Sequence, residues 1–295
     1  LMKIFDCTTY YSEDLMLDVR FNILNEYVYK FIIVESKYSH SGVKKKLNFD
    51  INNFKKFKDK IIYLVIENEP DGIEKISNFD SSSSIQRMNS LKRIEQSYNY
   101  MMRGISNALD DDLILLSDND EIPNLSSKQF KKSKKNIILF KQLFCHYKFN
   151  LLYDLLPWYG SRACKKKYLN SFSWLKNLKN KKYPFWRLDT IFSNNKLQNL
   201  EIILDGGWHF TNIKKPEDLF IKLSNFGHHN EFEVSGITIE KLKEQIDNKI
   251  INYNHFADKT EKNKYSFEYK LKSMNLNLLP EYLQSNKHKY NEWFD

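Results

Sequence analysis

Short apolar runs alternate with amphipathic segments along most of the chain. Runs of consecutive apolar residues predict buried strands, which lie at residues 3–7, 31–34, 61–66, 113–116, 136–140 and 200–204. Helical spacing of apolar residues, or a proline followed by acidic residues, predicts helices at residues 14–29, 85–109, from Pro216 onwards and at 237–251. Strands that alternate with helices predict a doubly wound α/β fold with a mostly parallel central sheet flanked by helices.

Residues 143–168 depart from this alternation. They are rich in aromatic side chains and irregular in pattern, so we expect a surface loop that handles a polar ligand. Its candidate ligand-binding residues include Asn150 and Trp158. The chain has no internal repeat and no long linker, so we expect residues 1–295 to form a single domain.

The segment at residues 113–123 carries the most specific chemistry. Four apolar residues lead directly into Asp118, Asp120 and Glu121, and Pro123 ends the segment. We therefore expect these carboxylates at the carboxyl end of a buried strand, where open α/β sheets bind ligands. On a strand, Asp118 and Asp120 would point the same way and would repel each other without a cation. Oxygen ligands suit Mg²⁺ or Mn²⁺, so the pattern predicts a metal site for a diphosphate. The alternative is a polar turn after a strand, because short D-x-D matches are common.

The composition limits the classes of partner that we expect the chain to bind. The net charge of +9, carried by lysine-rich tracts, favours an anionic partner such as a nucleotide diphosphate or a phospholipid surface. The sequence contains no recognised nucleic-acid-binding motif, so nucleic acid is not a predicted partner. Three scattered cysteines and an N-terminal stretch without a long apolar run favour a cytoplasmic protein, peripheral at most to the inner face of a membrane.

Four segments in order resemble glycosyltransferase family 17. They are FDC at residues 5–7, IVES at 33–36, LLSDNDEIP at 115–123 and GGWHF at 206–210. This is the family of the β-1,4-N-acetylglucosaminyltransferases that bisect N-glycans, and the chain looks like a bacterial-type member. The resemblance runs from Lys3 to about Glu231. Asn119 departs from the small or aliphatic residue expected between the aspartates, and residues 165–196 match nothing in the family pattern.

The resemblance implies a GT-A-type, Rossmann-like fold, a UDP-sugar donor and a divalent metal, Mn²⁺ or Mg²⁺. It divides the chain into a nucleotide-sugar-binding half (1–125), an acceptor and metal-completing half (126–235) and a C-terminal helical region (236–295). It makes Asp120 the first choice of metal ligand. Asp118 would bind the metal or the donor, and His209 would complete the metal shell. Judged without the family, a histidine beside Trp208 is more often packed or hydrogen-bonded than a ligand.

Further donor contacts are expected from three residues. Glu35 would bind the uracil or ribose, or else cap the turn after its strand. Arg103 would bind phosphate, although a surface salt bridge is equally consistent with its position. Glu121 would hold the turn or face the donor sugar.

By resemblance the reaction inverts the anomeric centre, which needs one carboxylate as the base. Glu231 is our first choice and Asp205 the second, with Asp189 a third possibility. Trp158 and Trp208 are candidates for stacking on an acceptor glycan or glycolipid, although buried tryptophan is the commoner role.

The sequence therefore predicts a metal-dependent inverting transferase that moves a sugar, N-acetylglucosamine by family default, from a UDP-sugar to a glycan hydroxyl. Two alternatives stay open. A retaining GT-A enzyme with a different donor would share the metal and nucleotide site. A non-enzymatic basic module that binds nucleic acid or an anionic membrane would show strong salt dependence and no metal requirement.

Overall fold

A computed structural model describes residues 2–295, except 76–81, 182, 185, 191, 197–198, 226–231, 234, 256–264 and 266. The strands are β1 (Ile4–Tyr10), β2 (Lys30–Ser36), β3 (Ile61–Ile66), β4 (Leu113–Leu116), β5 (Glu121–Pro123), β6 (Ile137–His146), β7 (Leu151–Leu152), β8 (Trp158–Lys165), β9 (Glu201–Ile203), β10 (Gly207–Thr211), β11 (Ile250–Ile251), β12 (Tyr269–Lys270) and β13 (Lys272–Ser273).

The α-helices are α1 (Asp14–Leu24), α2 (Ser82–Tyr100), α3 (Lys128–Lys132), α4 (Phe172–Lys176), α5 (Pro216–Asn225), α7 (Ile239–Asn248) and α8 (Glu281–Ser285). The 3₁₀ helices are η1 (Ile51–Lys60), η2 (Met101–Ile105), η3 (Lys166–Tyr168), η4 (Leu188–Thr190), η5 (Leu276–Leu278) and η6 (Lys287–Trp293). No helix in the described ranges is both long and apolar enough to cross a bilayer.

The central sheet is mixed but mostly parallel, which confirms the predicted fold class. Its main path runs β13-β7-β6-β8-β4-β1-β2-β3, and β10, β9 and β5 join it at or beside β6. Strands β3, β2, β1 and β4 are parallel, whereas β8 is antiparallel to both β4 and β6. Strand β10 is parallel to β6. The carboxyl ends of β1, β2, β4, β6 and β10 therefore lie at one edge of the sheet.

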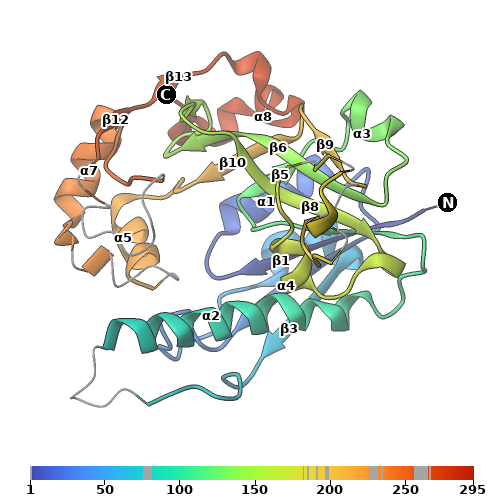
Figure 1. The fold of residues 1–295 in the computed structure, drawn as a ribbon. Coiled ribbons are helices and arrows are strands. Elements are labelled where there is room, and N and C mark those ends of the chain that lie inside the picture. The colour runs from blue at the N-terminus through green and yellow to red at the C-terminus, as the bar shows by residue number, and fades with distance from the viewer. Residues whose placement is uncertain are drawn as a thin grey trace.

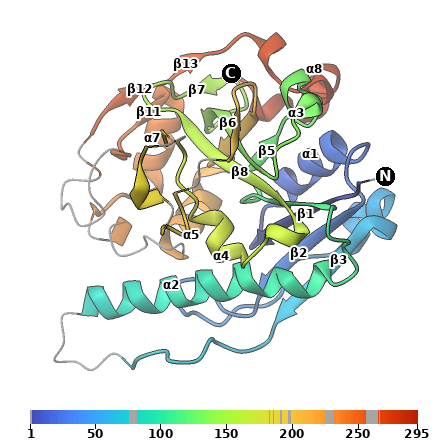
Figure 2. The ribbon, with the colours of Figure 1, turned by 45° about the vertical axis from the view of Figure 1, so that its right-hand side comes forward.

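Alternating side chains of the strands build a core on each face of the sheet. On β2, Phe31 and Ile33 pack in a cluster with residues of α1 such as Phe21, while Ile32 and Val34 pack in a second cluster with Met101 of η2. Figures 1 and 2 show α1 and α2 on opposite sides of the sheet. Because both faces are covered, continuous apolar runs form these strands, as the sequence predicts.

The prediction of a surface loop at residues 143–168 is wrong. This segment contains the end of β6, all of β7 and all of β8, and β8 lies inside the sheet between β4 and β6. Its polar residues bond within the sheet: the Ser161 hydroxyl lies 2.7 Å from that of Ser117, and Gln142 Nε2 donates to the Ser161 hydroxyl over 3.1 Å. Local pattern misses such a strand because its polar groups are satisfied by distant partners.

The C-terminal part forms a third apolar cluster beside the sheet edge. Leu219 of α5 and Leu242 of α7 are buried with Phe144 of β6 and Ile251 of β11. Both helices were predicted, but α7 packs against α5 and the end of β6 more than over the sheet. In Figure 1 they stand together at the left of the molecule. Helices α5 and α7 therefore stand beside the edge of the sheet at which the parallel strands end.

The glycine before Trp208 should be indispensable for folding. Gly207 has a φ of +112°, and a Cβ there would lie 2.2 Å from the Ile122 carbonyl oxygen of the paired strand β5. We predict that Gly207→Ala lowers the free energy of unfolding by about 3 kcal/mol or more, because backbone strain and overlap add. Urea unfolding followed by circular dichroism measures this loss.

Gly236→Ala is the matched control. Gly236 also has a positive φ, +64°, but nothing lies within 4 Å of its added Cβ. Its loss should be about 1 kcal/mol, from backbone strain alone. Equal losses for the two variants would contradict the steric argument.

Candidate active site

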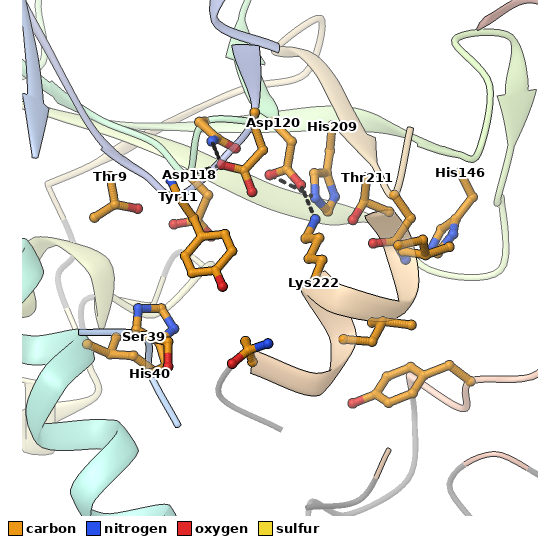
Figure 3. A pocket seen from close by; sticks show the side chains of 18 of the residues that line it. Thr9, Tyr11, Ser39, His40, Asp118, Asp120, His146, His209, Thr211 and Lys222 are labelled. Atoms are coloured by element: carbon orange, nitrogen blue, oxygen red, sulfur yellow. Dashed lines mark hydrogen bonds and ion pairs between the residues drawn. The ribbon is translucent and has the colours of Figure 1, made fainter. Parts of the chain in front are cut away.

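A cavity of about 550 Å³ opens at the carboxyl edge of the sheet. This volume lies within the usual range for small-molecule sites. Side chains at or just after the ends of five strands line it, among them Tyr11, Ser36, Asp118, His146 and Thr211. Figure 3 shows Asp118, Asp120, His209 and Lys222 between a group formed by Thr9, Tyr11, Ser39 and His40 and a second group formed by Thr211 and His146.

The two aspartates lie in a tight turn, which we call the aspartate loop (residues 117–120). Strand β4 ends at Leu116, so Asp118 and Asp120 do not continue the strand as the sequence spacing suggested. The Glu121 amide donates to the Asp118 carbonyl over 3.0 Å, and the Glu121 carboxylate accepts from the Asp118 amide over 3.0 Å. The same carboxylate accepts from Trp158 Nε1 over 3.1 Å. Glu121 is fully buried and holds the turn, one of its two predicted roles.

A buried arginine secures this loop from below. Arg20 of α1 donates two hydrogen bonds, of 2.7 and 2.5 Å, to the Asp6 carboxylate on β1. It also donates to the carbonyl oxygen of Asp118 in the loop over 3.4 Å, and to that of Glu121, directly after the loop, over 2.7 Å. Both charged side chains are fully buried. Sequence reasoning missed Arg20. The signal was its position three residues after Leu17 and four before Leu24, on the apolar face of the predicted helix.

Each aspartate of the loop faces a lysine from a distant helix. Asp118 accepts from Tyr98 over 2.7 Å and pairs with Lys176 of α4 at 2.9 Å. Burial alone would raise the pKa of Asp118, but the charge of Lys176 and the hydrogen bonds from Lys176 and Tyr98 together outweigh it, so that pKa lies below its usual value. Asp120 lies 3.6 Å from Lys222 of α5. In this structure, lysines supply the cations that clustered carboxylates need.

His209 completes the surroundings of Asp120. Its Nε2 lies 3.5 Å from Asp120 Oδ1. Burial would raise the pKa of Asp120, but His209 and Lys222 lower it further than burial raises it, so the carboxylate stays ionised. The imidazole packs against Phe144, at 4.6 Å, and against Trp158, at 4.3 Å between ring centroids, and these two rings lie 4.8 Å from each other, so the three form one cluster. Within the described part of the chain, the buried Nδ1 of His209 has no hydrogen-bond partner. The ring is therefore held edge-on to the aspartate.

The profile of glycosyltransferase family 17 matches residues 1–293. The chain belongs to glycosyltransferase family 17. It is therefore a glycosyltransferase, whose substrates are a sugar donor and a glycan acceptor. No curated protein matches the chain.

The structure brings together several of the residues that were singled out from the sequence. Asp118, Asp120, His209 and Trp158 all line the cavity. The described residues contain no group of three or more His, Cys, Asp or Glu side chains arranged for a metal. Asp120 and His209 are the two adjacent donors, an oxygen and a nitrogen, that face the same space.

Two of the expected donor contacts lie elsewhere in this glycosyltransferase. Glu35 is fully buried and accepts from the amides of Asn48 and Phe49 over 2.8 and 3.1 Å. It holds the segment after β2 rather than lining the cavity, which matches its alternative interpretation as a cap. Arg103 is exposed, and its guanidinium lies 4.2 Å from the Tyr100 ring centre. It does not line the cavity.

The acceptor and base candidates are also dispersed. Asn150 accepts from the amide of Asp295, and Trp208 Nε1 donates to the Leu278 carbonyl over 2.7 Å, so both serve the C-terminal packing. Asp205 is exposed and accepts from Asn124 over 3.0 Å, outside the cavity lining. Asp189 forms exposed ion pairs with basic side chains. Glu231 lies outside the described residues.

Sequence reasoning missed four residues at the cavity. These are Tyr98, Lys176, His146 and Lys222. Lys176 falls in the stretch 165–196 that matched nothing in the family pattern, and Lys222 lies on a correctly predicted helix. Only the packing of α4 and α5 against the sheet edge reveals their partners.

The buried ion pair beneath the loop should dominate local stability. We predict that Arg20→Met lowers the free energy of unfolding by about 3–5 kcal/mol, because it leaves Asp6 charged and buried without a partner. Urea unfolding measures the loss. Arg103→Met is the same change at an exposed arginine and should cost at most about 1 kcal/mol. A comparable loss in both variants would refute the role of burial.

Proposed function

We propose that the chain transfers N-acetylglucosamine from a UDP-sugar to a glycan hydroxyl, with inversion and with a divalent metal, on a GT-A-type fold. The observation that carries this proposal is the aspartate loop. It presents Asp118 and Asp120 to a cavity at the carboxyl edge of a mostly parallel sheet, beside His209. Ligands bind at this edge in open α/β sheets.

The nucleotide would lie over the ends of β1 and β2. There the cavity is lined by the polar side chains of Thr9, Ser36, Ser39 and His40, and Leu91 and Ile94 of α2 add apolar surface. A nucleoside needs both kinds of contact, polar groups for the ribose and the base edges and an apolar surface for the base.

The charge of the cavity supports a divalent ion. Its described lining holds three carboxylates, Glu13, Asp118 and Asp120, and three basic side chains, Lys45, Arg87 and Lys222, so their formal charges cancel. The diphosphate of a sugar nucleotide is a dianion, and burying it in a neutral cavity is costly without a compensating charge. One Mg²⁺ or Mn²⁺ restores the balance.

Asp120 and His209 would hold this ion. The lowered pKa of Asp120 keeps its carboxylate ionised. His209 Nε2 faces one oxygen of this carboxylate, Oδ1, at 3.5 Å. Two protein donors leave coordination positions for phosphate oxygens. When bound, the ion would act as a Lewis acid that stabilises the leaving diphosphate. Lys222 adds a positive charge to the same wall of the cavity.

The proposed inversion also needs a carboxylate that acts as the catalytic base. Among the described carboxylates of the lining, Glu13 already accepts from the amides of Tyr11 and Ser12 and from Asn119. Asp118 and Asp120 face cations. Glu231 therefore stays our proposed base, on sequence grounds alone.

Cytoplasmic location and peripheral contact with an anionic membrane remain predictions from the net charge of +9. Sedimentation with anionic vesicles at low salt tests the membrane contact. Absence of co-sedimentation under those conditions would eliminate it.

Donor binding should require both the metal and Asp120. We predict that UDP binds in the presence of Mn²⁺, and that Asp120→Asn weakens this binding at least about tenfold, because the substitution removes an ionised ligand. Isothermal titration calorimetry with and without Mn²⁺ measures both effects. Asp247→Asn, the same change at an exposed position of α7, should leave the affinity unaltered. Metal-independent UDP binding that tolerates Asp120→Asn would count against the metal assignment.

Inversion predicts the anomer of the first product. UDP-N-acetylglucosamine carries an α-linked sugar, so slow transfer to water should release β-N-acetylglucosamine before mutarotation. Proton NMR at early times distinguishes the anomers. Initial release of the α-anomer would identify the retaining alternative.

A further inference from the structure

The cavity continues beyond the aspartate loop, away from the nucleotide end. There it is bounded by the ends of β6 and β10 and by α5 and α7, with Phe144, His146, Thr211, Leu219 and Leu242 among its lining. In Figure 3, His146 and Thr211 lie on the opposite side of Asp120 and Lys222 from Ser39 and His40. The proposed nucleotide does not use this part of the cavity.

The register of β6 and β10 places the side chains of four residues on one face of the sheet. In the parallel pair, His209 lies beside Phe144, and Thr211 lies beside His146. Paired neighbours point to the same face, and so do residues two apart on one strand. His146 and Thr211 therefore form a second row, about 6.6 Å further along the strands than the row of His209 that faces Asp120. The sugar on the β-phosphate of a bound UDP-sugar would extend from the row of His209 to the row of His146 and Thr211.

His146 is buried with its polar atoms unused. The residue is 3% exposed, and neither Nδ1 nor Nε2 has a hydrogen-bond partner among the residues that the structure describes. Burial, and then the neighbouring His255, keep the pKa of His146 well below its usual value, so the ring is neutral. A neutral imidazole offers one donor and one acceptor. Leaving such buried groups unpaired is unfavourable, and a ligand that pairs with them would recover the lost hydrogen bonds.

The backbone at this row is strained. Tyr147, directly after His146, has a φ of +63°, and Asn212, directly after Thr211, has a φ of +57°. The left-handed region is costly for a tyrosine, and such strain is concentrated at functional sites. The Tyr147 amide donates to the Thr211 carbonyl over 3.2 Å, so the two turns are tied together. Both strands therefore end at the cavity wall in backbone conformations that are unfavourable in themselves.

We propose that His146 and Thr211 bind hydroxyl groups of the donor sugar and help to select it. This inference rests on the proposed function. The sugar must follow the diphosphate, and the part of the cavity on that side presents an unpaired neutral imidazole beside a threonine. A sugar hydroxyl both donates and accepts, which matches the two ring nitrogens of His146.

The test compares UDP with UDP-sugars. Affinities for UDP, UDP-N-acetylglucosamine, UDP-glucose and UDP-galactose are measured calorimetrically with Mn²⁺ for the wild type and for His146→Phe. Phenylalanine keeps an aromatic ring in an aromatic environment, so folding should be retained. We expect the best UDP-sugar to bind the wild type more tightly than UDP. His146→Phe should lower that affinity about tenfold and leave UDP binding unchanged.

Two further variants make the result interpretable. Thr211→Val removes only the hydroxyl and should produce a smaller loss of the same kind. His288→Phe, the same substitution at an exposed histidine, should change nothing. The inference is overturned if no UDP-sugar gains affinity over UDP in the wild type, if His146→Phe leaves the sugar's gain intact, or if it weakens UDP equally. Failure of UDP itself to bind the wild type would overturn the proposed function instead.

Discussion

The arrangement of the site depends on a buried ion pair, that of Arg20 with Asp6. Neither charge can reach water, so each must satisfy the other, and the geometry of the pair leaves one guanidinium nitrogen for the Glu121 carbonyl. One side chain thereby joins helix α1, strand β1 and the aspartate loop. An unpaired charge at this depth would cost several kcal/mol, so the three elements have little freedom to move apart.

Above this support, opposite charges come from distant parts of the chain. Lys176 and Lys222 follow the aspartate loop by more than 50 and more than 100 residues, yet each faces one of its carboxylates. They help to keep the buried Asp120 and the half-buried Asp118 ionised. A carboxylate that stays charged in a site of low polarity interacts strongly with any cation that enters. This property suits a transferase whose leaving group is an anionic diphosphate.

Much of the fold follows from local pattern. The apolar runs at residues 31–34, 61–66 and 113–116 are strands because both faces of the sheet are covered, and Pro216 begins a helix as its acidic neighbours suggested. Strand β8 escaped detection because Gly160, Ser161 and Arg162 are not apolar. The hydroxyl and amide of Ser161 find their partners, Ser117 and Gln142, only after β4, β6 and β8 have paired.

The sequence by itself determined the strands that are continuous apolar runs, and that Asp118 and Asp120 follow one of them at the carboxyl edge of the sheet. Tertiary structure alone decided which other side chains meet there. It brought Lys222, His146 and Arg20 to the site or beneath it, and placed Arg103, Asn150 and Trp208 elsewhere. The reason is physical: periodicity along the chain records whether a segment is buried. The partners of a buried polar group are set by pairing between residues far apart in sequence.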